Sequence, residues 1–505
     1  MIKNKYKKAG ISFVVVTVAG FGCQTTKTDN LRPNVVFIVV DDYGWMDTGF
    51  QGSEFYETPN LDKLAAEGMI FTNGYAASGV CSPSRVSLLT GRYPPRSGIT
   101  DWIKGYQADQ TPEQLSRYAM IGPENVYNLP HDEIAIARAL KDVGYNTCFV
   151  GKWHVGHDSL YWPEYHGFDK NVGGWLRGGP SGNREGNRSY YSPHNNPRLS
   201  DGPEDEFLTD RLVDESIAWM EMQEDNPFLL YLSFYVVHTP IHPKPEKVPY
   251  YEEKARRMGL DTLPAFSTDF EWYNNHPNPR WHWKERLVQN CPEYAALIES
   301  MDENLGRVLD YLKASGLDKN TIVVFTSDQG GLSTAETSPT YNGPLRAGKG
   351  WLYEGGIRVP YILKIPGKTT AGSVSDVPVH GIDLYPTILD ACNVDIPNKD
   401  EIDGLSLLPL VKGNKLDRQY LFWHYPHYGE KGDAPAGAVR KGDYKLLEFF
   451  ETGEIELYNL REDISELNNL SQVKPELARE LLEELKEWRE EVGAKMPRKN
   501  PYYAY

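Results

Sequence analysis

Four apolar segments of this sequence each end abruptly at polar residues. The first, Asn34–Val40, is followed at once by Asp41 and Asp42. The other three are Tyr145–Val150 before Lys152 and His154, Phe228–Tyr235 before His238, and Thr321–Thr326 before Asp328 and Gln329. Short continuous apolar runs are typical of strands that are buried on both faces of a sheet.

Helix-forming stretches lie between these segments, with apolar residues that recur about every 3.6 positions. They are Leu61–Gly68, Ile134–Val143, Asp210–Met222 and Glu293–Leu312. The alternation predicts an α/β fold in which a large, mostly parallel sheet is sandwiched between helices. A polar residue after one strand is usually a turn residue or a helix cap. Four such groups at the carboxyl ends of parallel strands, where α/β proteins bind ligands, predict a functional site.

The chain changes character after about residue 415. Short strand-like segments follow one another, and a charged amphipathic helix comes after them. These segments are Tyr420–Trp423, Gly437–Val439, Tyr444–Phe450, Glu454–Leu460 and the helix Pro475–Trp488. We predict a catalytic domain over residues 31–415 and a smaller subdomain, an antiparallel sheet with one helix, over residues 416–505. The stretch Gly173–Asp205 is rich in Gly, Asn and Ser and predicts a long loop of the kind that covers binding sites.

Composition excludes several classes of protein. Of the 505 residues, 40% are hydrophobic, which is enough for a large core and too much for a disordered chain. The net charge of −17 disfavours nucleic acid or an anionic membrane as a partner. With five cysteines in all, the chain has too few for a disulfide framework, and we expect Cys148 and Cys392 to be buried as small apolar residues.

Residues 1–23 have the features of an export signal. Four lysines precede the apolar run Ile11–Phe21, which is too short to span a membrane comfortably. Cys23 follows this run as in bacterial lipoprotein signals, although Gly20 and Phe21 depart from the residues usual there. We expect an exported protein of the bacterial periplasm or cell surface, with Cys23 as the candidate site of lipidation.

Two neighbouring motifs surround Cys81 and predict its place at an anion-binding helix end. Residues Cys81–Arg85 read Cys-Ser-Pro-Ser-Arg, and Leu88–Arg92 read Leu-Leu-Thr-Gly-Arg. Pro83 suits the first turn of a helix, with Ser82 or Ser84 at capping positions, so Cys81 is expected at a helix N-terminus. A thiolate nucleophile is one chemistry open to such a cysteine.

The two motifs together match the maturation signature of the formylglycine-dependent (type I) sulfatases. The resemblance extends from Arg32 to about Leu470 and includes arylsulfatase-like and bacterial polysaccharide enzymes of the alkaline phosphatase superfamily. It implies that a separate maturation enzyme oxidises Cys81 to an aldehyde, formylglycine, which hydrates to a geminal diol. One diol hydroxyl would attack sulfur and expel the alcohol. Loss of the proton from the second would then release sulfate and restore the aldehyde.

The resemblance also implies a calcium site. Asp41, Asp42, Asp328 and Gln329 match the positions of the family's metal ligands, and residue 81 would add another oxygen. The family more often has Asn or His where Gln329 stands. Carboxylate and amide oxygens are ligands that favour calcium over softer metals.

Cationic and protonating groups complete the implied site. By resemblance, Arg85 and His154 would orient or activate the diol, Lys152 and Lys349 would bind sulfate oxygens, and His238 or Lys349 would protonate the leaving alcohol. The expected activity is therefore that of a sulfuric ester hydrolase.

The substrate expected is a sulfated carbohydrate, such as a fragment of ulvan, carrageenan or a glycosaminoglycan. His424 and His427, in an aromatic-rich stretch, are candidate sugar contacts, although packing explains aromatic residues equally well. Two alternatives stay open at this point. The fold also permits a phosphoester or phosphonate hydrolase, or a non-catalytic glycan-binding lipoprotein.

Overall fold

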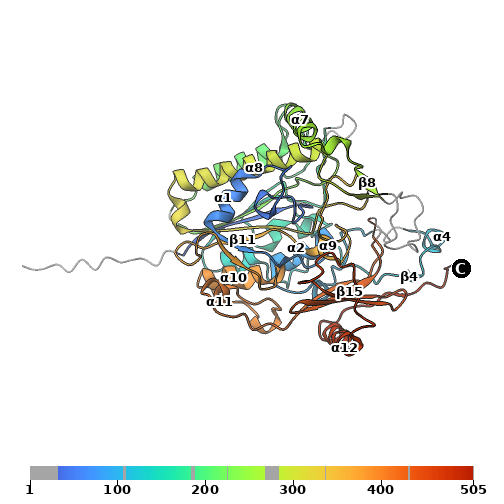
Figure 1. Ribbon diagram of the computed structural model, residues 1–505. Helices are drawn as coiled ribbons and strands as arrows, with labels where there is room; N and C mark the ends of the chain where they lie inside the picture. The colour runs from blue at the N-terminus through green and yellow to red at the C-terminus, as the bar shows by residue number, and fades with distance from the viewer. Residues whose placement is uncertain are drawn as a thin grey trace, which may run out of the picture. The chain divides into compact units, whose positions relative to one another are not determined.

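The computed structural model describes residues 32–105, 110–182, 188–224, 226–267, 284–335, 337–429, 431 and 433–503. They belong to one compact unit, Arg32–Tyr505. Its centre is a sheet of eight strands (Figure 1), in the order β12 (Ser373–Ser375), β2 (Met69–Phe71), β11 (Tyr361–Lys364), β10 (Thr321–Ser327), β1 (Asn34–Val40), β7 (Phe228–Ser233), β5 (Asn146–Gly151) and β6 (Lys170–Val172). The predicted export segment and Cys23 lie outside the described residues.

The large sheet is mixed but mostly parallel. β1 pairs in parallel with β10 and β7, and β5 pairs in parallel with β7 and β6. Only β11, among the described strands of this sheet, runs antiparallel to its neighbours β10 and β2. All seven residues of β1 are buried, because its two faces are both covered. The α/β fold predicted from the apolar runs is confirmed.

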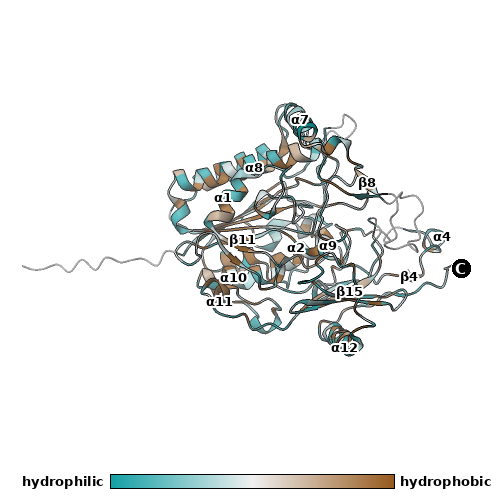
Figure 2. Ribbon diagram, viewed as in Figure 1, coloured by the Kyte–Doolittle hydropathy of each residue, from teal (hydrophilic) through white to brown (hydrophobic). Residues whose placement is uncertain are grey.

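Helices cover both faces of this sheet (Figure 1). On one face, the strand side chains pack against α1 (Pro59–Glu67), α6 (Leu208–Glu221), α7 (Val248–Met258) and α8 (Pro292–Ala314). On the other face lie α2 (Cys81–Thr90), α5 (Ile136–Lys141), α10 (Leu384–Ala391) and α11 (Leu408–Val411). Figure 2 shows α8 banded in brown and teal, as expected for a helix with one face against the core.

The helix starts differ from the predicted ones by one or two residues. α1 begins at Pro59 and α8 at Pro292, in each case with proline in the first turn. Proline fits there because the first backbone N–H groups of a helix have no intrahelical partner, and the fixed φ of the ring suits the helix.

The predicted antiparallel sheet with one helix is present near the C-terminus. Its strands, in sheet order, are β14 (Tyr420–Tyr425), β15 (Ala436–Lys441), β16 (Tyr444–Phe449) and β17 (Ile455–Asn459). Helix α12 (Pro475–Glu491) packs on one face, while the other face contacts the loops around Trp351 and Tyr353. The boundary at residues 415 and 416 stays a prediction.

The remaining described strands form three short pairs. They are β13 (Val379–His380) with β3 (Gly74–Tyr75), β18 (Arg498–Lys499) with β4 (Met120–Ile121), and β8 (Phe266–Ser267) with β9 (Glu285–Arg286). Cys148 and Cys392 are buried, as expected, and unpaired. Within the described ranges, no helix has the length and apolar character needed to cross a membrane.

Candidate active site

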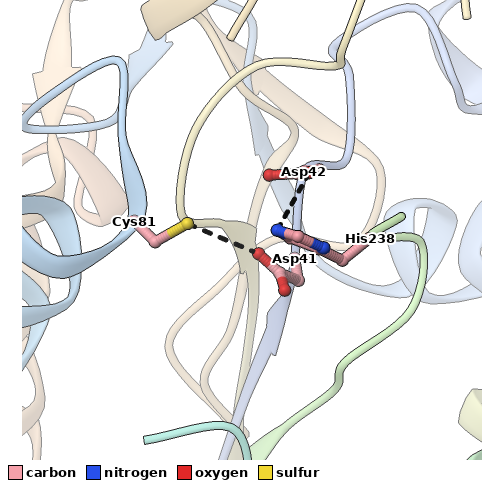
Figure 3. A group of neighbouring side chains, drawn as sticks. All are labelled: Asp41, Asp42, Cys81 and His238. Atoms are coloured by element: carbon pink, nitrogen blue, oxygen red, sulfur yellow. Dashed lines mark hydrogen bonds and ion pairs between the residues drawn. The ribbon is translucent and has the colours of Figure 1, made fainter. Parts of the chain in front are cut away.

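Four neighbouring strands deliver polar side chains to one place. β10, β1, β7 and β5 are adjacent in the sheet. Asp328 and Gln329 follow β10, Asp41 and Asp42 follow β1, His238 follows β7, and Lys152 and His154 follow β5. Figure 3 shows that Cys81 and His238 point toward Asp41 and Asp42. The Sγ atom of Cys81 lies 3.9 Å from Oδ1 of Asp41, and Nε2 of His238 lies 3.8 Å from Oδ2 of Asp42. The residues that follow the apolar runs therefore form one cluster.

Cys81 is the first residue of α2, and every residue of that helix is buried. The N-cap is Val80, whose side chain makes no capping bond, so the expectation of a Ser82 or Ser84 cap is wrong. Both serines instead hold the surrounding loops: Ser82 donates to the carbonyl of His154 at 2.7 Å, and Ser84 donates to that of Ser78 at 3.0 Å. The helix N-terminus is thereby fixed against the strand ends.

The acidic side of the cluster gathers groups that could hold a metal ion. Oxygen, nitrogen or sulfur atoms of Asp41, Asp42, Cys81 and His238 lie within 4.8 Å of one another. Asp328 joins them, because its Oδ1 accepts a hydrogen bond from the backbone N–H of Asp42 at 3.2 Å. Carboxylates gathered in a buried site repel one another unless cations balance them.

Gln329 provides the observation that tests a cation here. Its Nε2 donates to Asp42 and lies 3.5 Å from Sγ of Cys81, while its buried Oε1 has no hydrogen-bond partner among the described residues. A rotation of the amide by 180° exchanges Nε2 and Oε1 and would place Oε1 beside the Asp42 carboxylate. The residues present therefore fit a cation that takes oxygen ligands.

Two of the predicted cationic residues lie beneath the cluster. Arg85 donates from Nε to Asp328 at 2.8 Å and from Nη1 to Oγ of Ser233 at 2.6 Å. Lys152 is fully buried, with Nζ 2.7 Å from both carboxylate oxygens of Asp41. Buried ion pairs of this kind fix the carboxylates in place, because a buried charge left unpaired is costly.

His238 and Lys349 form a hydrogen-bonded pair at the open side of the cluster. Nδ1 of His238 lies 2.7 Å from the carbonyl of Thr239, so Nδ1 carries the hydrogen and Nε2 is the acceptor. Nε2 then accepts a hydrogen bond from Nζ of Lys349 at 3.1 Å. The same Nζ donates to Oδ2 of Asp42 at 2.8 Å.

Burial governs protonation in the cluster. It lowers the pKa of His154 and of His238 well below the ordinary value, and the nearby lysines lower both further. Burial also raises the pKa of the Cys81 thiol, although Lys152 and Lys349 oppose the rise. An unmodified Cys81 is therefore not poised as a thiolate at neutral pH.

The backbone is held in a strained conformation at two site residues. Asp42 and His154 have φ values of 57° and 54°, in the left-handed region that side chains other than glycine seldom adopt. Each lies just past the end of a strand, β1 or β5. Such strain persists only where the surrounding structure imposes it, and it clusters at functional sites.

Two glycines allow a loop to pack against both histidines. A Cβ atom at Gly178 would lie 2.4 Å from Cε1 of His154, and one at Gly179 would lie 3.2 Å from Nδ1 of His238. We expect Gly178→Ala to displace His154 and to lower the kcat of a reaction in which His154 takes part by about 10- to 100-fold, the cost of misplacing a reacting group by about 1 Å. An unchanged kcat in a variant with the parent's Tm would contradict this packing.

A cavity of about 570 Å³ opens over the cluster. Cys81, His154, His238 and Lys349 line its floor, and Leu176–Gly179 of the predicted covering loop line one wall. Sequence reasoning missed the rest of the wall, which includes Trp102, Lys104, His157, Tyr425, Lys431 and Asp433. These residues come from loops and one strand end, where no periodic pattern distinguishes them.

The structure does not bring His424 or His427 to this cavity. Both are buried: Nε2 of His424 bonds the carbonyl of Lys495 at 3.0 Å, and Nε2 of His427 bonds Oγ1 of Thr100 at 2.9 Å. Burial lowers the pKa of His424 to about 4 and that of His427 to about 3. Their partners are protein atoms, so neither is retained as a sugar contact.

Comparison with known proteins identifies the family of this chain. Residues 33–394 match the sulfatase family, and residues 347–491 match the family described as N-sulphoglucosamine sulphohydrolase, C-terminal. The chain belongs to the sulfatase family. This sulfatase is 30% identical over 561 residues to a sulfatase of Formosa agariphila, with 96% of this chain and 94% of the relative covered.

Two further relatives extend the comparison. N-acetylgalactosamine-6-sulfatase of Homo sapiens is 32% identical over 396 residues, covering 77% of this sulfatase and 68% of the human protein. The crystal structure of Ps i-CgsB in complex with k-i-k-neocarrahexaose superposes with a TM-score of 0.70 at 27% identity, covering 90% of this chain and 92% of that one. The predicted enzyme class, a sulfuric ester hydrolase, is confirmed, and so is the alkaline-phosphatase-like fold.

Proposed function

We propose that this sulfatase removes sulfate from sulfated carbohydrates, with residue 81 as formylglycine and calcium as its metal ion. The observation that carries the proposal is the position of Cys81, at the N-terminus of α2 and on the cavity floor beside His154, His238 and Lys349. The printed names of the relatives, N-acetylgalactosamine-6-sulfatase and a complex with a neocarrahexaose, support a sugar as the substrate.

The metal would be held by Asp41, Asp42, Asp328, Gln329 and the oxygen of the modified residue 81. A hard divalent cation supplies positive charge that neutralises a sulfate group and helps align the nucleophile. Calcium suits these ligands, which are carboxylate and amide oxygens on a buried framework. Arg85 and Lys152 hold Asp328 and Asp41, so the ligand carboxylates keep their positions.

In the proposed reaction, an oxygen on residue 81 attacks the sulfur of the ester. The new O–S bond forms as the bond from sulfur to the alcohol oxygen breaks, and that oxygen takes up a proton. The proton comes from Nζ of Lys349, which donates to His238 in the resting structure at 3.1 Å. The second hydroxyl on residue 81 then loses its proton, the bond from carbon to the sulfated oxygen breaks, and sulfate leaves as the aldehyde is restored. His154, whose neutral ring lines the cavity floor, orients the diol.

We also propose that the protein is exported, that Cys23 is lipidated, and that a separate maturation enzyme supplies the oxidant that converts Cys81. These proposals rest on the residues around Ile11–Phe21 and on the Cys81–Arg85 motif. No nucleic acid partner is expected, given the net charge of −17.

The proposed function is tested by comparing substrates on protein made together with a maturation enzyme. We expect turnover of 4-nitrophenyl sulfate and of at least one sugar in a panel of N-acetylgalactosamine 6-sulfate, N-acetylgalactosamine 4-sulfate and a neocarrabiose sulfate, with slower turnover of 4-nitrophenyl phosphate. Faster phosphate than sulfate hydrolysis would contradict the reaction proposed. Turnover of the aryl sulfate but of none of the sugars would contradict the substrate.

A further inference from the structure

One buried carboxylate in the cavity wall has no role in the proposed reaction. Asp433 is 1% exposed and lines the cavity. Its Oδ1 accepts a hydrogen bond from the backbone N–H of Lys431 at 3.1 Å, and among the described residues its Oδ2 has no hydrogen-bond partner. A buried carboxylate oxygen without a hydrogen-bond donor costs free energy, so a ligand that donates an O–H or N–H hydrogen bond to Oδ2 would be stabilised here.

The described side chains around Asp433 do not supply a hydrogen-bond donor to Oδ2. Lys431 through its charge and Tyr425 through a hydrogen bond both lower the pKa of Asp433, but neither bonds Oδ2 among the described residues. The Tyr425 hydroxyl also donates to Oδ1 of Asp101 at 3.0 Å. Burial outweighs these contributions and raises the pKa of Asp433 to about 7.

Two glycines form a cradle for this carboxylate beside the reaction centre. A Cβ atom at Gly350 would lie 2.7 Å from Oδ1 of Asp433, and one at Gly429 would lie 2.0 Å from Oδ2. Gly350 directly follows Lys349, whose Nζ hydrogen-bonds His238. The carboxylate therefore packs against the backbone next to the residue that protonates the leaving alcohol.

Above pH 7, where Asp433 is mostly ionised, the chemistry of a carboxylate restricts what it can bind. It accepts hydrogen bonds only, so neither a sulfate oxygen nor an apolar ring satisfies it. In a sulfated sugar, free hydroxyl groups lie on the same ring as the sulfated carbon, close to the leaving oxygen. An aryl sulfate such as 4-nitrophenyl sulfate offers no such donor.

We infer that Asp433 is a specificity-determining residue, which accepts a hydrogen bond from a free hydroxyl of the sugar that carries the scissile sulfate. The inference rests on the proposed function and adds to it the requirement for a free hydroxyl near the sulfated position. Hydrogen bonds to charged groups contribute about 1.5–3 kcal/mol, or about 10- to 100-fold in kcat/KM.

The test compares Asp433→Ala with the parent on three substrates. These are the best sugar sulfate of the panel above, its analogue lacking the free hydroxyl nearest the sulfated carbon, and 4-nitrophenyl sulfate. In Asp433→Ala, the ratio of kcat/KM for the sugar sulfate to that for 4-nitrophenyl sulfate is expected to fall about 10- to 100-fold. The corresponding ratio for the deoxy analogue is expected to fall much less, since it cannot make the bond. The exposed Asp400→Asn provides a matched control.

Other outcomes separate this inference from the proposed function. Equal losses on the sugar sulfate and on 4-nitrophenyl sulfate would overturn the inference alone, as would equal losses on the sugar sulfate and its deoxy analogue. A parent enzyme that hydrolyses none of the sugars would overturn both. Asp433→Asn, which keeps the shape of the side chain, replaces the alanine variant if that one has a lowered Tm.

Discussion

Cys81→Ala is expected to lose sulfate ester hydrolysis by a factor on the order of 10⁴ or more, the usual scale for removal of a covalent nucleophile. The variant should remain folded, because the side chain is small and, among the described residues, its sulfur makes long contacts, 3.9 Å to Asp41 and 3.5 Å to Gln329. Turnover of 4-nitrophenyl sulfate and thermal unfolding measure the two effects. In the active parent, mass spectrometry should find an aldehyde at residue 81.

Cys81→Ser separates the two halves of the proposed reaction. An unmodified serine presents one oxygen where the hydrated aldehyde presents two, so it can take the sulfuryl group but has no second hydroxyl to expel it. We expect one equivalent of 4-nitrophenol per enzyme and a peptide heavier by one SO₃ group. Sustained turnover by this variant with serine intact, or an active parent in which residue 81 is wholly thiol, would contradict the mechanism.

The fold could be predicted because its central strands are buried on both faces. Asn34–Val40 and Thr321–Ser327 pair along their whole length, and runs of this kind have few alternatives to the interior of a covered sheet. The bounds were less accurate. Helix α5 covers Ile136–Lys141 rather than Ile134–Val143, since periodicity alone does not locate the ends of a helix.

The floor of the site and one wall could be predicted, but the rest of the wall could not. Asp41, Lys152, His238 and Asp328 follow strands, and the order of strands in a parallel sheet brings such residues together. Asp433 lies on a loop, and only the fold places it beside Gly350.

His424 and His427 show the converse. The aromatic-rich stretch around them suggested sugar binding, but each imidazole has a hydrogen-bond partner inside the protein. A sequence does not distinguish a histidine that faces a ligand from one that is satisfied by packing.

Chelation is expected to lower both activity and thermal stability, and added calcium should restore them. A ligand that binds only the folded state at 100 times its Kd stabilises that state by about 2.7 kcal/mol. Without the cation, the positive charge of the site comes from Arg85, Lys152 and Lys349, and these residues are already paired with the carboxylates of Asp328, Asp41 and Asp42. Less positive charge is then left to neutralise sulfate. Tm and the turnover of 4-nitrophenyl sulfate, measured before and after calcium is restored, test both effects.

Asp328→Asn should reproduce the effect of chelation, with a loss of about 100-fold or more in kcat, because it removes a charged ligand and the partner of Arg85 at once. Gln329→Ala removes one neutral oxygen and leaves that ion pair intact, so it should weaken calcium binding with a smaller loss of activity at saturating calcium. If both variants respond to calcium as the parent does, these residues are not its ligands. Full activity and an unchanged Tm in protein shown by elemental analysis to be free of metal would remove the cation from the mechanism and leave Arg85, Lys152 and Lys349 as the charges that neutralise sulfate.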